Sequence, residues 1–146
     1  MNKWDAVEKD TFTIEKFKQK LNCDLAFMDY YKSIFISAKT GLRAEKIFDM
    51  ALNVLQNAKQ RISTGTLNEV ITDAVRTTEP PTKSGRRLKI YYAVQDGILP
   101  PTFILFVNSQ DLMHFSYKRY LENTLRKTFN FEGTPIRLII REKSED

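Results

Sequence analysis

Few side chains in this 146-residue chain have the type and spacing needed for acid–base, nucleophilic or metal chemistry. His114 is the single histidine, and no serine or cysteine nucleophile pattern accompanies it. We therefore interpret it as a helix-packing residue rather than a general base. Cys23, the single cysteine, has no companions at metal-ligand spacing and cannot form an internal disulfide, which favours a reducing, cytoplasmic setting. The sequence predicts no enzyme active site and no metal site.

Basic residues offer a second kind of chemistry, the binding of phosphates. The chain carries a net charge of +5, and between residues 83 and 141 ten Lys/Arg stand against four acidic residues. Such a surface fits an acidic partner such as RNA, because phosphate contacts dominate nucleic-acid affinity and aromatic rings stack on bases. A solvated charged surface is the alternative for each residue. The candidates for RNA contact are Lys83, Arg86, Arg87, Lys89, Tyr91, Lys118, Arg119, Arg126 and Lys127.

Two strands in the middle of the chain would position these groups. Alternating apolar residues predict a first strand with one buried face, and Asp96-Gly97 and Pro100-Pro101 predict a turn after it. Residues 102–107 are almost entirely apolar, which predicts a strand covered on both faces or one whose aromatic face meets a partner. The side chains expected on the buried face of the first strand are Leu88, Ile90, Tyr92 and Val94.

Helical patterns flank these strands on both sides. A capping box, Thr66 to Glu69, predicts a helix that ends near Thr78, and a second helix is expected after Ser109. Residues 82–87 are expected to form a basic loop, and alternating apolar residues predict a last strand at 136–141. The result is an α-β-β-α-β unit: a three-stranded sheet with two helices available to cover one face.

The first sixty residues predict a helix over 10–21, a loop over 22–32, a short strand over 33–37 and a helix from 47 to about 60. One strand cannot form a sheet, so we interpret residues 1–60 as the remnant of a larger α/β domain. A linker at 61–65 would join it to a domain at 61–146. The fold class is therefore α/β (α+β), with an expected frayed polar tail at 142–146. No apolar run approaches membrane-spanning length, and no signal peptide is expected.

Two short motifs and one long region resemble the Der/EngA GTPases. Asn2-Lys3-Trp4-Asp5 matches the NKxD element, and Ser37-Ala38-Lys39 matches the SAK element, by which small GTPases recognise guanine. The region from about residue 64 to 141, with LKIYYAVQ, PPTFILFVN, SYKRYLEN and FEGTPIRL, is similar to their C-terminal KH-like domain. These bacterial ribosome-assembly proteins have two G domains in tandem. The resemblance implies the end of the second G domain followed by the KH-like domain.

The resemblance also implies roles for six residues in recognising guanine. The Asp5 carboxylate would accept hydrogen bonds from guanine N1–H and the exocyclic amine, and the Ala38 amide would donate to O6. Asn2 would fix the loop, and the stem of Lys3 would lie along the base. Ser37 and Lys39 would hold the turn that carries the Ala38 amide.

Several family elements are missing from the sequence. No G-x-x-x-x-G-K-[ST] phosphate loop and no switch segments occur, so we expect this chain not to be a GTPase and to hold no cofactor. GTP or GDP and Mg²⁺ would belong to the full-length parent. The five glycines at 41, 65, 85, 97 and 133 provide no GXXG loop of the kind KH domains use.

The implied partners are ribosomal RNA of the large subunit and the parent's own G domains, with no membrane involved. The alternative is a protein-interaction module that regulates the G domains without binding RNA, in which the apolar strand around residues 103–107 docks on them.

Overall fold

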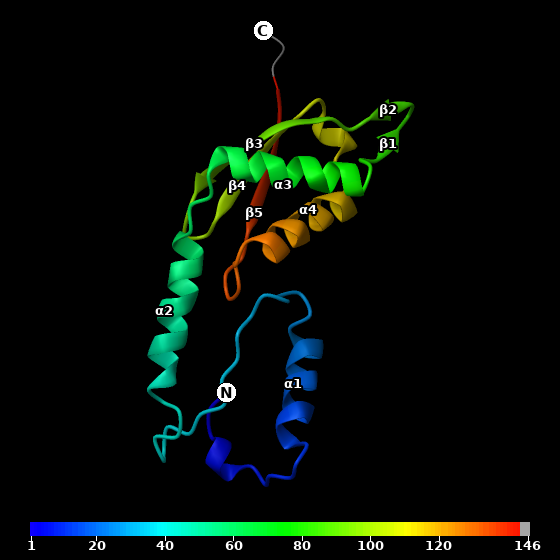
Figure 1. Ribbon diagram of the computed structural model, residues 1–146. Coiled ribbons are helices and arrows are strands. Elements are labelled where there is room, and N and C mark those ends of the chain that lie inside the picture. Colours follow the sequence, from blue (N-terminus) through cyan, green and yellow to red (C-terminus); the bar gives the residue numbers. More distant parts are fainter. Residues whose placement is uncertain (144–146) are drawn as a thin grey trace.

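Over residues 1–143, which the computed structural model describes, the chain forms four α-helices, five strands and two short 3-10 helices (Figure 1). The expected tail is partly ordered, since Glu142 ends the last strand, and residues 144–146 lie outside the described part. In chain order the elements are η1 (Trp4–Ala6), α1 (Thr13–Asp24), α2 (Lys46–Lys59), α3 (Thr64–Thr77), β1 (Thr82–Lys83), β2 (Arg86–Arg87), β3 (Ile90–Gly97), β4 (Thr102–Val107), η2 (Gln110–Leu112), α4 (Phe115–Thr128) and β5 (Arg137–Glu142).

A mixed three-stranded sheet organises the second half of the chain. Its order is β3-β4-β5, with β3 antiparallel to β4 and β5 parallel to β4. Helices α3 and α4 lie side by side over one face of this sheet (Figure 1). The α-β-β-α-β order and the mixed α/β class predicted from periodicity are confirmed.

The hydrophobic core lies between the sheet and the helices α3 and α4. Alternate residues of β4 point into it, and the apolar stripes of both helices close over them. Removing a leucine or phenylalanine side chain from water contributes about 1.5–3 kcal/mol each, so this layer dominates the stability of the fold. Its fully buried large side chains include Leu67, Leu88, Phe103, Leu105, Val107, Leu121, Leu125 and Phe131.

The predicted inward face of β3 is wrong beyond Ile90. Ile90 pairs with Val107 and Tyr92 with Phe106, so one extra residue, Tyr91, is inserted between them as a β-bulge. An inserted residue shifts every later side chain to the opposite face. Ala93 is therefore fully buried under α3, whereas Tyr92 is 38% exposed on the other face.

Amide side chains tie α3 and the segment before it to β3. The side chain of Asn68 on α3 donates to the Ala93 carbonyl and accepts from the Ala93 amide, both at 2.8 Å. Further along β3, Gln95 accepts from the Ile62 amide at 2.8 Å and donates to the Gln60 carbonyl at 2.9 Å. The chain between α2 and α3 is thereby held against the sheet.

Helix α3 begins earlier than the sequence predicted. Its N-cap is Ser63, whose hydroxyl accepts a hydrogen bond from the Thr66 amide at 3.1 Å. The proposed capping box at Thr66 and Glu69 is therefore wrong, because a serine three residues upstream already satisfies the first free amides. The linker expected over residues 61–65 is correspondingly shorter.

The residues expected to form a basic loop instead form a small hairpin, the basic finger (residues 82–87). Thr82 pairs with Arg87 and Lys83 with Arg86. Ser84 and Gly85 turn the chain with φ angles of 51° and 73°, the left-handed pair that a two-residue hairpin turn requires.

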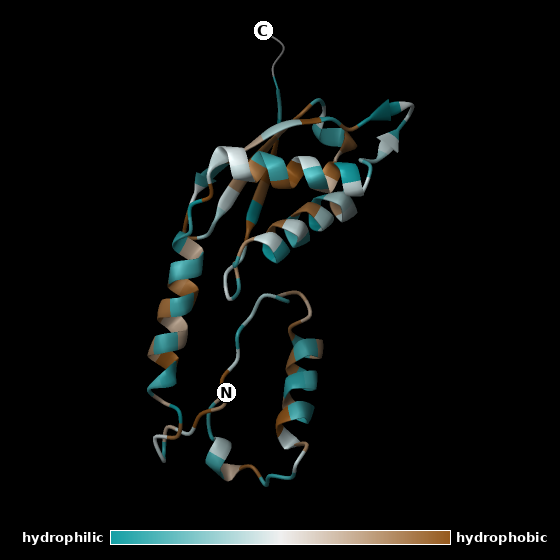
Figure 2. Cartoon of the chain, viewed as in Figure 1, coloured by the Kyte–Doolittle hydropathy of each residue, from teal (hydrophilic) through white to brown (hydrophobic). Residues whose placement is uncertain are grey.

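The first sixty residues form a thinner structure around one aromatic cluster. Trp4 is buried against Phe35, with ring centroids 4.6 Å apart, and against Phe17 at 5.5 Å. Figure 2 shows α1 to be largely hydrophilic. This helix starts and ends about three residues later than predicted, so it includes residues 22–24, which were expected in a loop.

The predicted strand over residues 33–37 is wrong. The segment is extended and its Ile36 amide donates to the Met1 carbonyl at 2.8 Å, but only an isolated bridge between Ser37 and Leu42 is formed there. A strand needs a continuous ladder to a neighbour, and residues 1–60 supply none. The helix predicted to end near residue 60 is confirmed as α2.

Candidate functional site

The two motifs expected to read guanine lie together at one end of the molecule. The Asn2 side-chain oxygen accepts from its neighbour's amide, that of Lys3, at 2.7 Å and from the Ala38 amide at 3.0 Å. The Ser37 hydroxyl donates to the Asp5 carboxylate. Side chains from one motif therefore fix the backbone and side chains of the other across more than thirty residues of sequence.

Trp4 positions these loops and was not among the predicted site residues. Its indole is 4% exposed, and its amide donates to the Ile36 carbonyl at 2.9 Å. Lys3 before it adopts a left-handed φ of 64°, so the chain reverses and leaves Asp5 exposed to solvent. The sequence signal that could have indicated this role is the aromatic residue between polar neighbours in NKWD.

One expected donor is already occupied. The Ala38 amide, which the resemblance assigned to guanine O6, donates to Asn2 in this structure. Lys39 is exposed beside it, and the Thr40 amide donates to the Ser37 hydroxyl at 3.2 Å. A guanine base would therefore compete with Asn2 for this amide.

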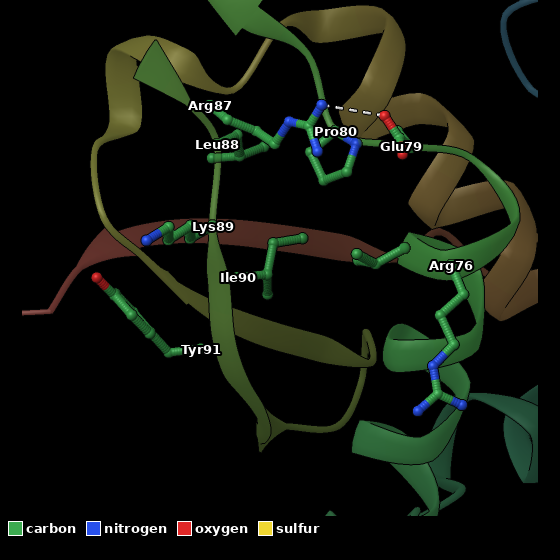
Figure 3. A pocket seen from close by; sticks show the side chains of 9 residues that line it. Arg76, Glu79, Pro80, Arg87, Leu88, Lys89, Ile90 and Tyr91 are labelled. Carbon is green, nitrogen blue, oxygen red and sulfur yellow. Dashed lines mark hydrogen bonds and ion pairs between the residues drawn. The ribbon is translucent and has the colours of Figure 1, made fainter.

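The basic finger and the start of β3 bring together five of the candidate RNA-contact residues. A hollow of about 460 Å³ lies between this segment and the end of α3 (Figure 3). Arg76 of α3 also lines it and was not among the predicted residues; its guanidinium points away from Arg87 in Figure 3 and pairs with Asp73 of its own helix at 3.6 Å. The predicted residues Lys83, Arg86, Arg87, Lys89 and Tyr91 are all exposed, and Arg87, Lys89 and Tyr91 line the hollow.

Two of these side chains have partners in the protein. Arg87 forms an ion pair with Glu79 at 3.1 Å, drawn as a dashed line in Figure 3. Tyr91 is 49% exposed, and the ammonium of Lys143 lies 5.5 Å from its ring centroid. Lys83, Arg86 and Lys89 are therefore the cleaner candidates for phosphate contact.

The basic residues predicted on α4 do not act as one surface. Arg119 and Lys127 are exposed and Lys118 is half-buried. Arg126 donates to the carbonyls of Phe131 and Thr134 at 3.2 and 2.9 Å. Burial lowers the pKa of its guanidinium, against the opposing charge of Asp29. Arg126 thus has a structural role that its sequence position did not reveal.

A comparison with protein families identifies the second half of the chain. Residues 61–141 match the family described as the KH-domain-like region of EngA bacterial GTPase enzymes, C-terminal. The chain belongs to this family.

Relatives of the KH-like chain extend the similarity to the first sixty residues. Proteins named GTPase Der from Agathobacter rectalis and Pelotomaculum thermopropionicum are 50% and 53% identical to it over all 146 residues, and one from Staphylococcus carnosus is 49% identical over 144 residues. In each case the chain spans 33% of the relative's length.

The loop between α4 and β5 joins the KH-like region to the first sixty residues. The amide of Gly133 donates to the Tyr30 carbonyl at 2.7 Å, and the Asn57 side chain donates to the Glu132 carbonyl at 2.9 Å. Lys32 forms an ion pair with Glu132 at 3.0 Å. We call these residues the junction; it also includes the guanidinium of Arg126, 4.4 Å from the centroid of the Tyr30 ring.

Neither a metal cluster nor a helix suited to a bilayer occurs in the described part of the chain. Residues 1–143 contain no group of three or more His, Cys, Asp or Glu placed to hold a metal ion. Within the same residues, none of the helices combines the length and apolar character that crossing a bilayer requires.

Proposed function

We propose that the chain is the C-terminal part of a GTP-binding protein of ribosome assembly, and that its KH-like region contacts ribosomal RNA. The observation that carries this proposal is the basic finger: Lys83 and Arg86 are exposed on it, and Arg87, Lys89 and the exposed Tyr91 line the hollow beside it. Clustered cations beside an aromatic ring suit a phosphate backbone and its bases. The family membership supports the same role.

The test is binding of the chain to large-subunit ribosomal RNA fragments across a salt series. A variant with Lys83, Arg86 and Lys89 changed to alanine should bind more weakly, with a log–log salt slope reduced by about 0.7–0.9 for each phosphate that is no longer neutralised. The control variant, with exposed Lys20, Lys46 and Lys59 changed to alanine, removes the same charge from the other half of the chain. Equal slopes in the two variants would contradict the finger as the RNA surface.

We also propose that residues 2–5 and 37–39 select guanine in the full-length protein. The residues are Asn2, Lys3, Asp5, Ser37, Ala38 and Lys39, held in one place by the hydrogen bonds described above. The chain contains no G-x-x-x-x-G-K-[ST] loop, so it lacks the phosphate contacts that supply most nucleotide affinity. Titration of Trp4 fluorescence should show weak binding of GDP, weaker binding of ADP, and loss of the difference in Asp5→Ala.

A second candidate function is docking on the parent's G domains. The sheet face opposite the helices carries an apolar patch: Tyr92 stacks on Phe106 with ring centroids 4.4 Å apart, and Ile139, between Arg137 and Arg141 on β5, is 38% exposed. A chain that binds no RNA, but associates with separately produced G domains independently of salt, would favour this function over the first.

A further inference from the structure

A second cleft lies where the turn after α1 faces helix α4, away from the basic finger. It encloses about 500 Å³, within the usual range for a small ligand. One wall comes from residues 26–30 and the other from α4, and Figure 1 shows these two segments facing one another. Neither the guanine-reading loops nor the finger contributes to it.

Two phenylalanines on the walls of this cleft are largely exposed, as Phe12 and Phe48 are elsewhere in the chain. Phe27 is 75% exposed and Phe115 is 72% exposed, and they come from segments almost ninety residues apart. Keeping two such rings in water gives up the stabilisation that burial would provide. Flat aromatic rings are the groups on which proteins stack unpaired bases.

The remaining lining mixes charged and polar residues, the acidic Asp29 among them, with Ala26, Tyr30, Pro135 and Ile136. Lys118 and Arg119 supply cations near Phe115, as a phosphate backbone requires. Asn123 and Glu122 supply donors and acceptors of the kind that read base edges. Glu122 is half-buried, and it takes part in no ion pair formed within residues 1–143.

Glu122 distinguishes this cleft from an ordinary charged surface. Lys118 and Arg126 lie four residues away on either side, at the spacing that favours pairing, yet burial raises the pKa of the Glu122 carboxyl against their charge. Glu122 lines the cleft and is half-buried. A base edge with an exocyclic amine would give its carboxylate a donor.

We propose that this cleft binds one unpaired nucleotide of RNA, with its base against Phe27 and Phe115 and the adjoining phosphates at Lys118 and Arg119. The inference rests on the proposed RNA-binding function and adds the place and the single-stranded character of the contact. Paired bases are excluded, because in a duplex their faces are covered by neighbouring bases. A docked protein segment is the competing occupant, and the three cations of the lining, Lys118, Arg119 and Arg126 against two carboxylates, favour RNA over it.

The experiment uses the whole chain and a short mixed-sequence RNA whose adenines are replaced by 2-aminopurine, one position at a time. Each RNA is tested as a single strand and as a duplex with its complement. Phe27→Ala and Phe115→Ala are compared with Phe48→Ala, a phenylalanine on α2 that is 74% exposed outside the cleft. Phe115→Leu keeps the apolar bulk without the aromatic face. Because all three phenylalanines are exposed, the variants should fold normally, which circular dichroism checks.

Single-strand binding should weaken about tenfold or more in Phe27→Ala and Phe115→Ala. It should stay weak in Phe115→Leu and be unchanged in Phe48→Ala. One 2-aminopurine position should be quenched by the wild type and not by Phe115→Ala. Equal binding of single strand and duplex, or wild-type affinity in Phe27→Ala, Phe115→Ala or Phe115→Leu, would overturn the inference and leave RNA binding at the finger intact. Absence of any RNA binding at low salt would overturn the proposed function together with this inference.

Discussion

At the scale of single residues, Tyr117 links the ionisation of one side chain to the stability of the fold. Its hydroxyl donates to the Thr78 carbonyl at 2.8 Å, and burial raises the pKa of Tyr117 to about 12 from 10.0. Because the folded pKa lies above the unfolded value, this contribution is complete below pH 10.0 and is lost as the pH rises toward 12. Denaturant midpoints should therefore fall more steeply over this range in the wild type than in Tyr117→Phe.

The same variant has a second readout at neutral pH. Tyr117→Phe removes a hydrogen bond to the end of α3 and should lower the free energy of unfolding by about 1 kcal/mol. Tyr91→Phe, at an exposed position, serves as the control. Parallel pH profiles for the wild type and Tyr117→Phe would contradict the linkage.

The cap of α3 gives a prediction that separates two interpretations of the same sequence. Ser63→Ala should lower the free energy of unfolding by about 1 kcal/mol, because the Thr66 amide loses its acceptor. Glu69→Ala should have almost no effect, since Glu69 is not part of the cap. Urea denaturation measures both, and a larger loss in Glu69→Ala would restore the capping box that the structure replaces.

Resemblance to a family, rather than residue types, predicted part of the candidate site. NKWD and SAK could be placed at one site because their order matched a family, and the structure brings their side chains together. The support from Trp4 was missed because burial is set by Phe17 and Phe35, which are distant in sequence. Arg126 was grouped with surface cations because its carbonyl partners lie in a loop beyond its own helix.

At the scale of elements, the junction depends on a position where only glycine fits. Gly133 has a φ of +83°, and an added Cβ would lie 2.3 Å from a methyl carbon of Val54 on α2. Gly133→Ala should therefore cost about 1–3 kcal/mol and separate the loop from α2. Amide hydrogen exchange should rise in residues 30–34 and 131–135.

Relief of the steric contact provides the control for this prediction. Val54→Ala combined with Gly133→Ala should recover part of the lost stability, because the truncated side chain no longer meets the new Cβ. The unfavourable φ remains, so recovery should be incomplete. Additive losses in the double variant would show that contact with Val54 is not the cause.

Periodicity predicted the long elements and failed at the short or irregular ones. Helices α3 and α4 and strand β4 carry apolar residues at the spacing that burial requires, so their existence could be predicted. Helix α2 has the same helical spacing, although Ile47 and Leu55 are exposed. The bulge at Tyr91 could not be predicted, because one inserted residue barely changes the composition of a strand while it reverses the faces to which the later side chains point. The two-residue strands of the finger are too short to show a period at all.

At the scale of the whole molecule, burial is unevenly divided between the two halves of the chain. The core cluster runs from Leu67 to Leu138, whereas the aromatic cluster around Trp4 is the main buried apolar group of residues 1–60. Native-state hydrogen exchange should therefore show residues 1–60 opening at a lower free energy than α3, α4 and β4. Uniform protection across both halves would contradict this division.

The arrangement of the two halves could not be predicted from the sequence. The contacts that join them come from Tyr30, Asn57, Glu132 and Gly133, none of which carries a recognisable pattern. Such contacts depend on where the helices and loops end, and small shifts in those ends move them. The order of the elements could be predicted, but their relative placement could not.

The paired hydrogen bonds between Asn68 and Ala93 have a consequence for how copies of the molecule meet. β3 is an outer strand of the sheet, and an outer strand is a template on which another chain can extend the sheet and begin aggregation. Asn68 occupies both backbone groups of Ala93, so an incoming strand would first have to displace the amide. A side chain from α3 thus covers the β3 edge of the sheet at Ala93 and hinders edge-to-edge association there.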